Sequence, residues 1–108
     1  MITRKLVLLA FLLNTAACAS LIQSTSLADA YKAYEREDFE RTLELISRSE
    51  NLADPSREMK AELTYLKANT HERLGEEAIA NTLYAYLAAE HGDSQYGYLA
   101  SEKLGLSR

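Results

Sequence analysis

The sequence is poor in the residues that cross-link, break or turn a chain. It has one cysteine, Cys18, so an internal disulfide bond is impossible and a cysteine-rich zinc site is excluded. One proline and four glycines are few for a β-rich domain of 108 residues, which needs frequent turns, so the composition favours helices. No run of basic residues occurs and the formal charge is −4, which argues against nucleic acid as a partner.

Motifs that carry chemistry are missing as well. The sequence has no glycine-rich phosphate loop and no G-x-S-x-G motif. Its two histidines, His71 and His91, lie 20 residues apart, and the segment after His71 lacks the second histidine of an H-E-x-x-H zinc motif. The acidic residues are interspersed with arginines, as on a solvated helical face. We therefore expect a protein that is not an enzyme and binds no cofactor and no metal.

Residues 1–17 have the order of a secretory signal peptide. Arg4 and Lys5 form a short basic start, an apolar run covers residues 6–13, and small residues follow up to Cys18. The apolar run falls well short of the roughly 20 residues that a membrane-spanning helix needs. The segment predicts export and removal of residues 1–17, with an uncleaved anchor or a buried helix as the alternative. Removal of the two basic residues would make the chain more acidic.

The small residues before Cys18 suggest what happens to that cysteine. Thr15-Ala16-Ala17-Cys18 resembles the lipobox of bacterial lipoproteins, although Thr15 stands where leucine is usual. The resemblance implies that the Cys18 thiol receives a diacylglyceryl group and becomes the new N-terminus. The following Ala19, with no aspartate after it, implies delivery to the outer membrane, with the domain facing the periplasm. Cleavage of the A-x-A site before Ser20 is the alternative, and would leave a soluble periplasmic protein without cysteine.

The rest of the chain predicts helices and no strand. Residues 18–25 are uncharged and mostly small or polar, as in a short tether. From residue 26 onward, apolar residues recur with a helical period. The expected N-cap residues are Ser26, Asp38, Asp54 with Pro55 after it, and Asp93 or Ser94, and the fourth helix is expected from about Glu76 to His91. Because the links are short, neighbouring helices must pack antiparallel. Residues 26–108 are thus predicted to form an all-α domain of about five helices.

The apolar stripes of these helices can be assigned one by one. The stripes are expected to consist of Leu27, Ala30, Tyr31 and Tyr34; of Phe39, Thr42, Leu43 and Ile46; of Met59, Leu63, Leu66 and Leu74; of Ile79, Ala80, Leu83, Tyr84 and Leu87; and of Tyr96, Leu99, Ala100 and Leu104. Gly75 and Gly92 are expected to end the third and fourth helices.

An internal repeat with an offset of 38 residues relates the two halves. Setting Glu37 on Gly75 places Ala30 on Ala68, Thr42 on Ala80 and Ile46 on Tyr84. Small residues in the first helix, the Ala80-x₃-Tyr84 pair and the position of Pro55 resemble the tetratricopeptide repeat (TPR) family. The tryptophan, leucine and tyrosine of the family signature are not matched, so a generic antiparallel bundle is the alternative. The resemblance implies a superhelical stack of helix pairs that is closed by a last helix.

Seven tyrosines stand out in a chain with two phenylalanines. Tyrosine is common at recognition surfaces, because an apolar ring carries a polar hydroxyl. In the TPR family the first helix of each pair lines a concave surface. The resemblance places six residues there, namely Tyr31, Tyr34, Glu62, Tyr65, Asn69 and Glu72. They predict a groove with a tyrosine floor and an acidic rim for a basic or mixed segment of a partner. Alternatively, these tyrosines complete a thin core.

These features predict a membrane-anchored, TPR-like lipoprotein of the bacterial cell envelope. It would act as a protein–protein interaction adaptor or assembly factor, with envelope proteins as partners, the membrane bound through the lipid on Cys18, and no nucleic acid. The alternative is a non-lipidated periplasmic helical bundle with a structural, oligomeric or enzyme-accessory role.

Overall fold

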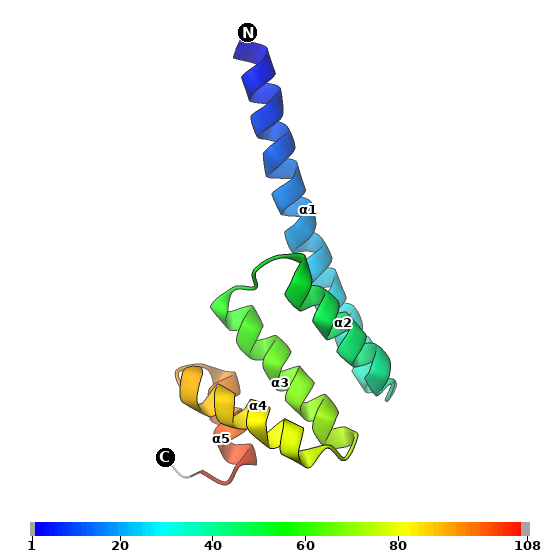
Figure 1. Ribbon diagram of the computed structural model, residues 1–108, viewed down its shortest axis with the longest axis vertical. Helices are drawn as coiled ribbons and strands as arrows, with labels where there is room; N and C mark the ends of the chain where they lie inside the picture. Colours follow the sequence, from blue (N-terminus) through cyan, green and yellow to red (C-terminus); the bar gives the residue numbers. More distant parts are fainter. Residues whose placement is uncertain (1, 107–108) are drawn as a thin grey trace.

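The computed structural model describes residues 2–106, with side chains from Cys18 onward. The described residues form five helices and no strand. The helices are α1 (Ile2–Glu35), α2 (Phe39–Leu52), α3 (Arg57–Arg73), α4 (Glu77–Glu90) and α5 (Gln95–Lys103). Figure 1 shows α1 and α2 side by side, α3 next to them, and α4 and α5 at the far end. The packing of α1 on α2, α3 on α4 and α4 on α5 confirms the predicted all-α fold of helix pairs.

Helix α1 is longer than predicted. It continues through residues 18–25 and past Ser26, so these residues form neither a tether nor an N-cap. Figure 1 shows its first half projecting beyond the other helices. Only the backbone of residues 2–17 is described. Met1, in the predicted signal peptide, and residues 107–108, in the predicted helical domain, lie outside the described residues. No helix in the described part of the chain is long and apolar enough to cross a membrane.

Side-chain packing explains why the predicted tether is helical. The Gln23 side chain donates hydrogen bonds to the carbonyl oxygens of Ser49 and Ala53, at 2.9 and 2.7 Å. In return, the Ser49 hydroxyl donates to the Gln23 carbonyl oxygen at 3.0 Å. Gln23 and Ser26 are both buried at the contact between α1 and α2. Small polar side chains thus mark a close helix contact here, and the packed domain begins at about Gln23.

Capping residues fix the starts of three other helices. Asp38 accepts a hydrogen bond from the Arg41 amide at the start of α2, as predicted. Of the two candidates for α5, Ser94 is the N-cap and accepts from the Gly97 amide. The predicted start of α3 at Asp54 was wrong, because Ser56 is the N-cap and accepts from the Met59 amide. Each cap supplies an acceptor to an amide that has no partner inside the helix.

The two turns related by the 38-residue offset have the same geometry. Glu37 and Gly75 both adopt the left-handed backbone conformation, with φ of 61° and 78°. In each turn the next amide donates five residues back, from Asp38 to Ala33 and from Glu76 to His71, both at 2.9 Å. Such bonds satisfy the last carbonyl groups of a helix. The hairpins α1–α2 and α3–α4 therefore reverse direction in the same way, although only the second uses glycine.

The aligned core positions of the two halves are also equivalent. None of the six is more than 2% exposed: Ala30, Ala68, Thr42, Ala80, Ile46 and Tyr84. Two apolar clusters result, one among α1, α2 and α3 and the other among α3, α4 and α5. Helix α3 contributes to both and is the centre of the fold.

Three leucine or isoleucine residues that were predicted inside the helix stripes are exposed. Leu74 follows the last residue of α3, and Ile79 lies in the first turn of α4. Leu99 lies on α5, which packs only against α3 and α4 and so keeps one open side. A periodic stripe shows which face of a helix is apolar, but it does not show how much of that face a neighbouring helix covers.

We expect Gly97→Ala to destabilise the fold. A Cβ at Gly97 would lie 1.9 Å from the backbone oxygen of His91, so α5 would have to move away from the end of α4. We expect a loss of about 2 kcal/mol in the free energy of unfolding, measured by urea denaturation with circular dichroism.

Gly75→Ala is the matched control. No atom lies within 4 Å of a Cβ there, and only the positive φ penalises alanine, by about 1 kcal/mol. Alanine in an unobstructed helix interior is more favourable than glycine by about 1 kcal/mol, so a stabilising Gly97→Ala variant would contradict the close contact.

Candidate partner-binding face

The six residues predicted for the groove lie on α1 and α3, and two further tyrosines, Tyr84 of α4 and Tyr96 of α5, contact members of this set. The tyrosine cluster, as we name it, has eight members: Tyr31, Tyr34, Glu62, Tyr65, Asn69, Glu72, Tyr84 and Tyr96. Helices α1 and α3 supply the predicted six, and α4 and α5 supply Tyr84 and Tyr96. Most of these side chains are partly buried, so the cluster lies at the edge of the core.

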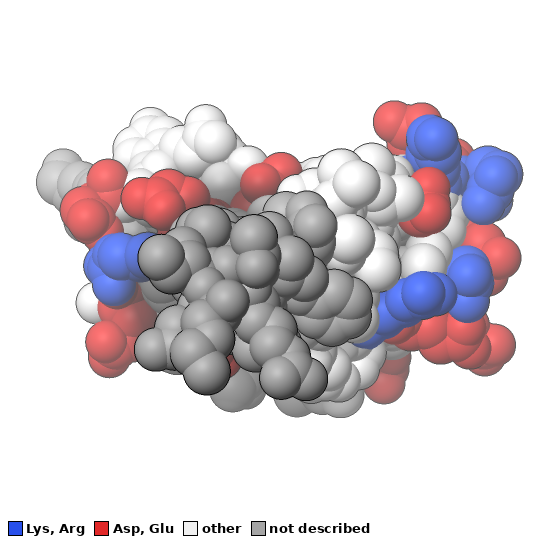
Figure 2. All heavy atoms as spheres, turned by 90° about the horizontal axis from the view of Figure 1, so that it is seen from above, with Lys and Arg blue, Asp and Glu red and all other residues white. Residues whose placement is uncertain are grey.

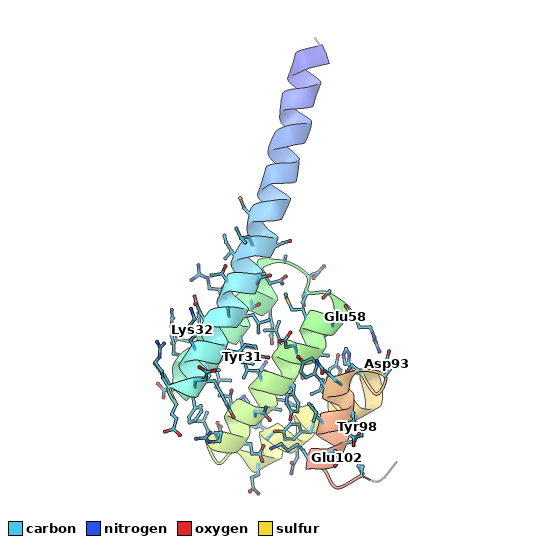
Figure 3. The ribbon with its side chains drawn as sticks, turned by 180° about the vertical axis from the view of Figure 1, so that it is seen from behind. Tyr31, Lys32, Glu58, Asp93, Tyr98 and Glu102 are labelled. Atoms are coloured by element: carbon cyan, nitrogen blue, oxygen red, sulfur yellow. The ribbon has the colours of Figure 1, made fainter. Side chains whose placement is uncertain are left out.

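A hydrogen bond between Tyr31 and Glu62 joins α1 to α3. The Tyr31 hydroxyl donates to Glu62 Oε1 at 2.8 Å. Figure 3 shows Tyr31 between the two helices. Burial, followed by the hydrogen bond to Glu62 and its charge, raises the pKa of Tyr31 far above its usual value. The phenol therefore keeps its proton and remains a donor to the carboxylate.

A second phenol–carboxylate contact lies between α4 and α3. The Tyr84 hydroxyl lies 2.6 Å from Glu72 Oε2 and 2.5 Å from Asn69 Oδ1. Burial, and then the hydrogen bond to Glu72, raises the pKa of Tyr84. The same hydrogen bond lowers the pKa of Glu72, although burial acts to raise it. Lys103 also lowers this pKa, because its Nζ lies 3.1 Å from Glu72 Oε2.

Aromatic rings link these two contacts. The Tyr65 ring centroid lies 5.9 Å from that of Tyr84 and 5.6 Å from that of Tyr96. Burial and the charge of Glu62 raise the pKa of Tyr96. Tyr65 thus connects α3 to both α4 and α5, at ring separations typical of favourable aromatic pairs.

Tyr34 lies at the end of the cluster near the first turn. Its ring packs edge-on against Phe39 at 5.6 Å. The Arg73 guanidinium lies 5.0 Å from the centre of the Phe39 ring and 5.9 Å from that of Tyr34, and forms an ion pair with Glu37. A cation from α3 therefore covers aromatic rings of the first hairpin.

The predicted acidic rim is largely engaged within the protein. Glu62 accepts from Tyr31, and Glu72 contacts Tyr84 and Lys103. Exposed acidic side chains remain at the edges, and Figure 3 labels Glu58 at the start of α3 and Glu102 on α5. Glu58 precedes Glu62 by one helical turn and extends the predicted stripe of α3.

Sequence reasoning missed three contributors to the cluster. Tyr84 and Tyr96 were assigned to core stripes, and Lys103 was not considered. The helical spacing of the two tyrosines correctly indicated burial. It does not predict which group pairs with a tyrosine hydroxyl or with a lysine ammonium group. The 38-residue alignment, which paired Tyr84 with the buried Ile46, was the one available hint that Tyr84 lies centrally.

A separate cleft of about 580 Å³ lies between the end of α2, α3 and α4. Its charged side chains have both signs, and Lys67 and Glu50 face each other at 3.8 Å. The lining residues are Glu50, Asn51, Asp54, Pro55, Lys60, Leu63, Thr64, Lys67, Leu83 and Tyr86. No sequence pattern pointed to this cleft, because three helices and a loop contribute to it.

The two histidines have protein neighbours at helix ends. His71 Nδ1 lies 3.2 Å from Glu76 Oε1 across the second turn. His91 is the C-cap residue of α4 and is buried, with Nε2 3.4 Å from the Tyr86 hydroxyl. Its Nδ1 has no hydrogen-bond partner among the described residues.

Cys18, the predicted lipidation site, has an exposed side chain on α1.

Comparison of the chain with known protein families, with curated proteins and with solved structures found no match.

We expect the pKa of Glu72 to depend on Tyr84. Because this pKa is lowered in the folded chain, the carboxylate stabilises the fold above about pH 4.5, and the contribution is lost as the pH falls through the folded pKa. In Tyr84→Phe the hydrogen bond is gone, so the pKa of Glu72 should rise. A carbon-13 NMR titration of the side-chain carboxyl groups measures it.

Tyr86→Phe is the control, because Tyr86 lies on the same helix and contacts His91. The same change in the pKa of Glu72 in both variants, or in neither, would disprove the assigned cause.

Proposed function

We propose that the chain is a lipid-anchored, TPR-like protein of the bacterial envelope that binds a basic or mixed segment of another envelope protein and is not an enzyme. The observation that carries this proposal is the tyrosine cluster, in which two equivalent hairpins and α5 bring phenols and carboxylates to one side of the fold. Exposed Glu58 and Glu102 lie at its edges.

The TPR-like part of the proposal is supported by the 38-residue equivalence. The turns at Glu37 and Gly75 match, and the paired core positions are buried in both halves. In an array of such repeats, the first helix of each unit contributes to one shared surface. Helices α1 and α3 hold those positions here and carry all six predicted groove residues.

The charge of the partner is inferred from contacts within the chain. Lys103 Nζ lies 5.9 Å from the Tyr84 ring centroid, and Arg73 covers Phe39 and Tyr34. Basic side chains thus already bind aromatic rings and carboxylates of the cluster. A partner's lysine or arginine could use the same chemistry, because aromatic faces attract cations and carboxylates pair with them.

The envelope location is supported by the N-terminal sequence. Residues 1–17 have the order of a signal peptide, and Cys18 follows small residues as in a lipobox. Outer-membrane attachment facing the periplasm follows from that resemblance. If cleavage occurs before Ser20 instead, the same domain would be a soluble periplasmic protein with a structural, oligomeric or accessory role.

The proposal is tested by charge reversal at the edge of the cluster. The full chain is crosslinked in membranes of the producing bacterium, and the co-purified partner is quantified by mass spectrometry. We expect Glu58→Lys to lower the yield about tenfold, equivalent to about 1.4 kcal/mol of binding free energy.

Glu40→Lys is the matched control, because Glu40 occupies the first turn of α2 as Glu58 occupies the first turn of α3. Both changes place a positive charge at a helix N-terminus and should cost similar stability. An equal loss of partner in the two variants, or no loss in either, would reject the tyrosine cluster as the binding face.

A further inference from the structure

Exposed apolar side chains gather at the end of the domain where Cys18 lies. Leu21 and Ile22 of α1 are 68% and 42% exposed, and Leu52 of α2 is 37% exposed. The two helices run antiparallel with Ser49 opposite Gln23, so Leu52 lies near the level of Leu21. The three side chains therefore belong to one end of the helix pair.

A shallow groove continues from this end between α1 and α2. Its volume is about 300 Å³. Three apolar residues, Leu21, Ile22 and Leu45, line it together with Thr25, Ser26, Asp29, Arg41 and Arg48. Figure 2 looks down on this end and shows a broad uncharged area beside the grey residues, with charged side chains concentrated toward the two sides. This end of the helix pair thus presents three exposed apolar side chains beside a groove of mixed character, which carries two arginines and one aspartate.

Cys18 lies on the same face of α1 as Leu21 and Ile22. Residues three and four positions apart are neighbours on a helix, so Cys18 precedes both by one turn. Its side chain is exposed, and α1 is unbroken from there into the packed domain. The apolar patch therefore begins one helical turn beyond the proposed lipidation site.

The packing of Gln23 leaves little freedom between Cys18 and the domain. The hydrogen bonds of Gln23 to Ser49 and Ala53 hold α1 against α2 at that level. Five residues of helix separate Cys18 from Gln23, which is about 7.5 Å at 1.5 Å per residue. Acyl chains on Cys18 would hold this end of the domain at the bilayer surface, because no flexible segment intervenes.

We propose that Cys18, Leu21, Ile22, Leu52 and Arg48 form a lipid-contacting end of the domain, in addition to the acyl chains. This inference rests on the lipidation of Cys18 in the proposed function. The leucine and isoleucine side chains enter the interface between headgroups and acyl chains, as the apolar side of an interfacial helix does. Arg48 reaches headgroup phosphates with its guanidinium while its stem stays at the groove beside the leucine and isoleucine side chains.

This contact sets the orientation of the whole molecule. Helix α1 leads from Cys18 away from the lipid, and α4 and α5 lie at the opposite end (Figure 1). The tyrosine cluster, which involves α1, α3, α4 and α5, then stands above the membrane.

Spin labels on α2 test the proposal. The full chain carrying Leu52→Cys or Glu40→Cys is produced in a bacterium, purified, labelled with a nitroxide and reconstituted into vesicles of phosphatidylethanolamine and phosphatidylglycerol. Both positions are exposed on the same helix and lie about 18 Å apart along it. The mass of the mature N-terminus is measured on the same samples.

We expect acyl chains on Cys18, which leaves the introduced cysteine as the one free thiol. The ratio of collisions with lipid-soluble oxygen to collisions with a water-soluble nickel chelate should be at least about threefold higher at position 52 than at position 40. Equal ratios on acylated protein would overturn this inference and leave the lipidation intact. A mass without acyl chains would overturn both.

A third outcome would identify a different occupant of the patch. If a second copy of the chain covers it, labels at position 52 would be shielded from both reagents and would broaden each other's spectra. That result would also overturn the inference, in favour of a dimer.

Discussion

The alignment of the two helix hairpins combines apolar packing of α1 and α2 on α3 with a directional contact, a hydrogen bond between a phenol and a carboxylate. Tyr31 of α1 donates to Glu62 of α3, two helices that otherwise share few contacts. Hydrogen bonds to charged groups typically contribute about 1.5–3 kcal/mol, more than a bond between neutral groups. Apolar burial is not directional, whereas this bond and the Tyr84–Glu72 contact favour one orientation of α1 and α4 on α3.

The same contacts impose a compromise on function. Each carboxylate of the cluster that accepts a hydrogen bond from a tyrosine is less available to a partner, and Glu72 also forms an ion pair with Lys103. The basic partner segment that we propose would therefore compete with Lys103 for Glu72. Binding at the exposed edges, near Glu58 and Glu102, leaves the internal bonds in place. The interpretation that the tyrosines complete the core and the proposal that they bind a partner thus apply to different parts of one surface.

The sequence predicted the fold well where helical signals were local. The left-handed turn at Gly75, the caps Asp38 and Ser94, and the buried small residues Ala30 and Ala68 all follow from short patterns. It failed at residues 18–25, because their polarity indicated a tether while the hydrogen bonds of Gln23 to Ser49 and Ala53 made them part of a packed helix. Those partners lie 26 and 30 residues away, so no local pattern contains them.

For the candidate site, the predicted stripe places Glu62, Tyr65, Asn69 and Glu72 along α3, and Glu62 accepts a hydrogen bond from Tyr31 of α1. What the sequence could not supply was the pairing of individual groups. Tyr84 bonds to residues of a neighbouring helix, and Lys103 reaches Glu72 from α5. Such pairs depend on how helices cross, which only the assembled fold determines.

A double-mutant cycle on Tyr31 and Glu62 tests the central claim most directly. The free energies of unfolding of the native chain, Tyr31→Phe, Glu62→Gln and the double variant are measured by urea denaturation. If the phenol–carboxylate bond aligns the hairpins, the two substitutions should show a coupling of at least about 1 kcal/mol. Effects that add to within about 0.3 kcal/mol would show that the residues do not cooperate, and would contradict the account.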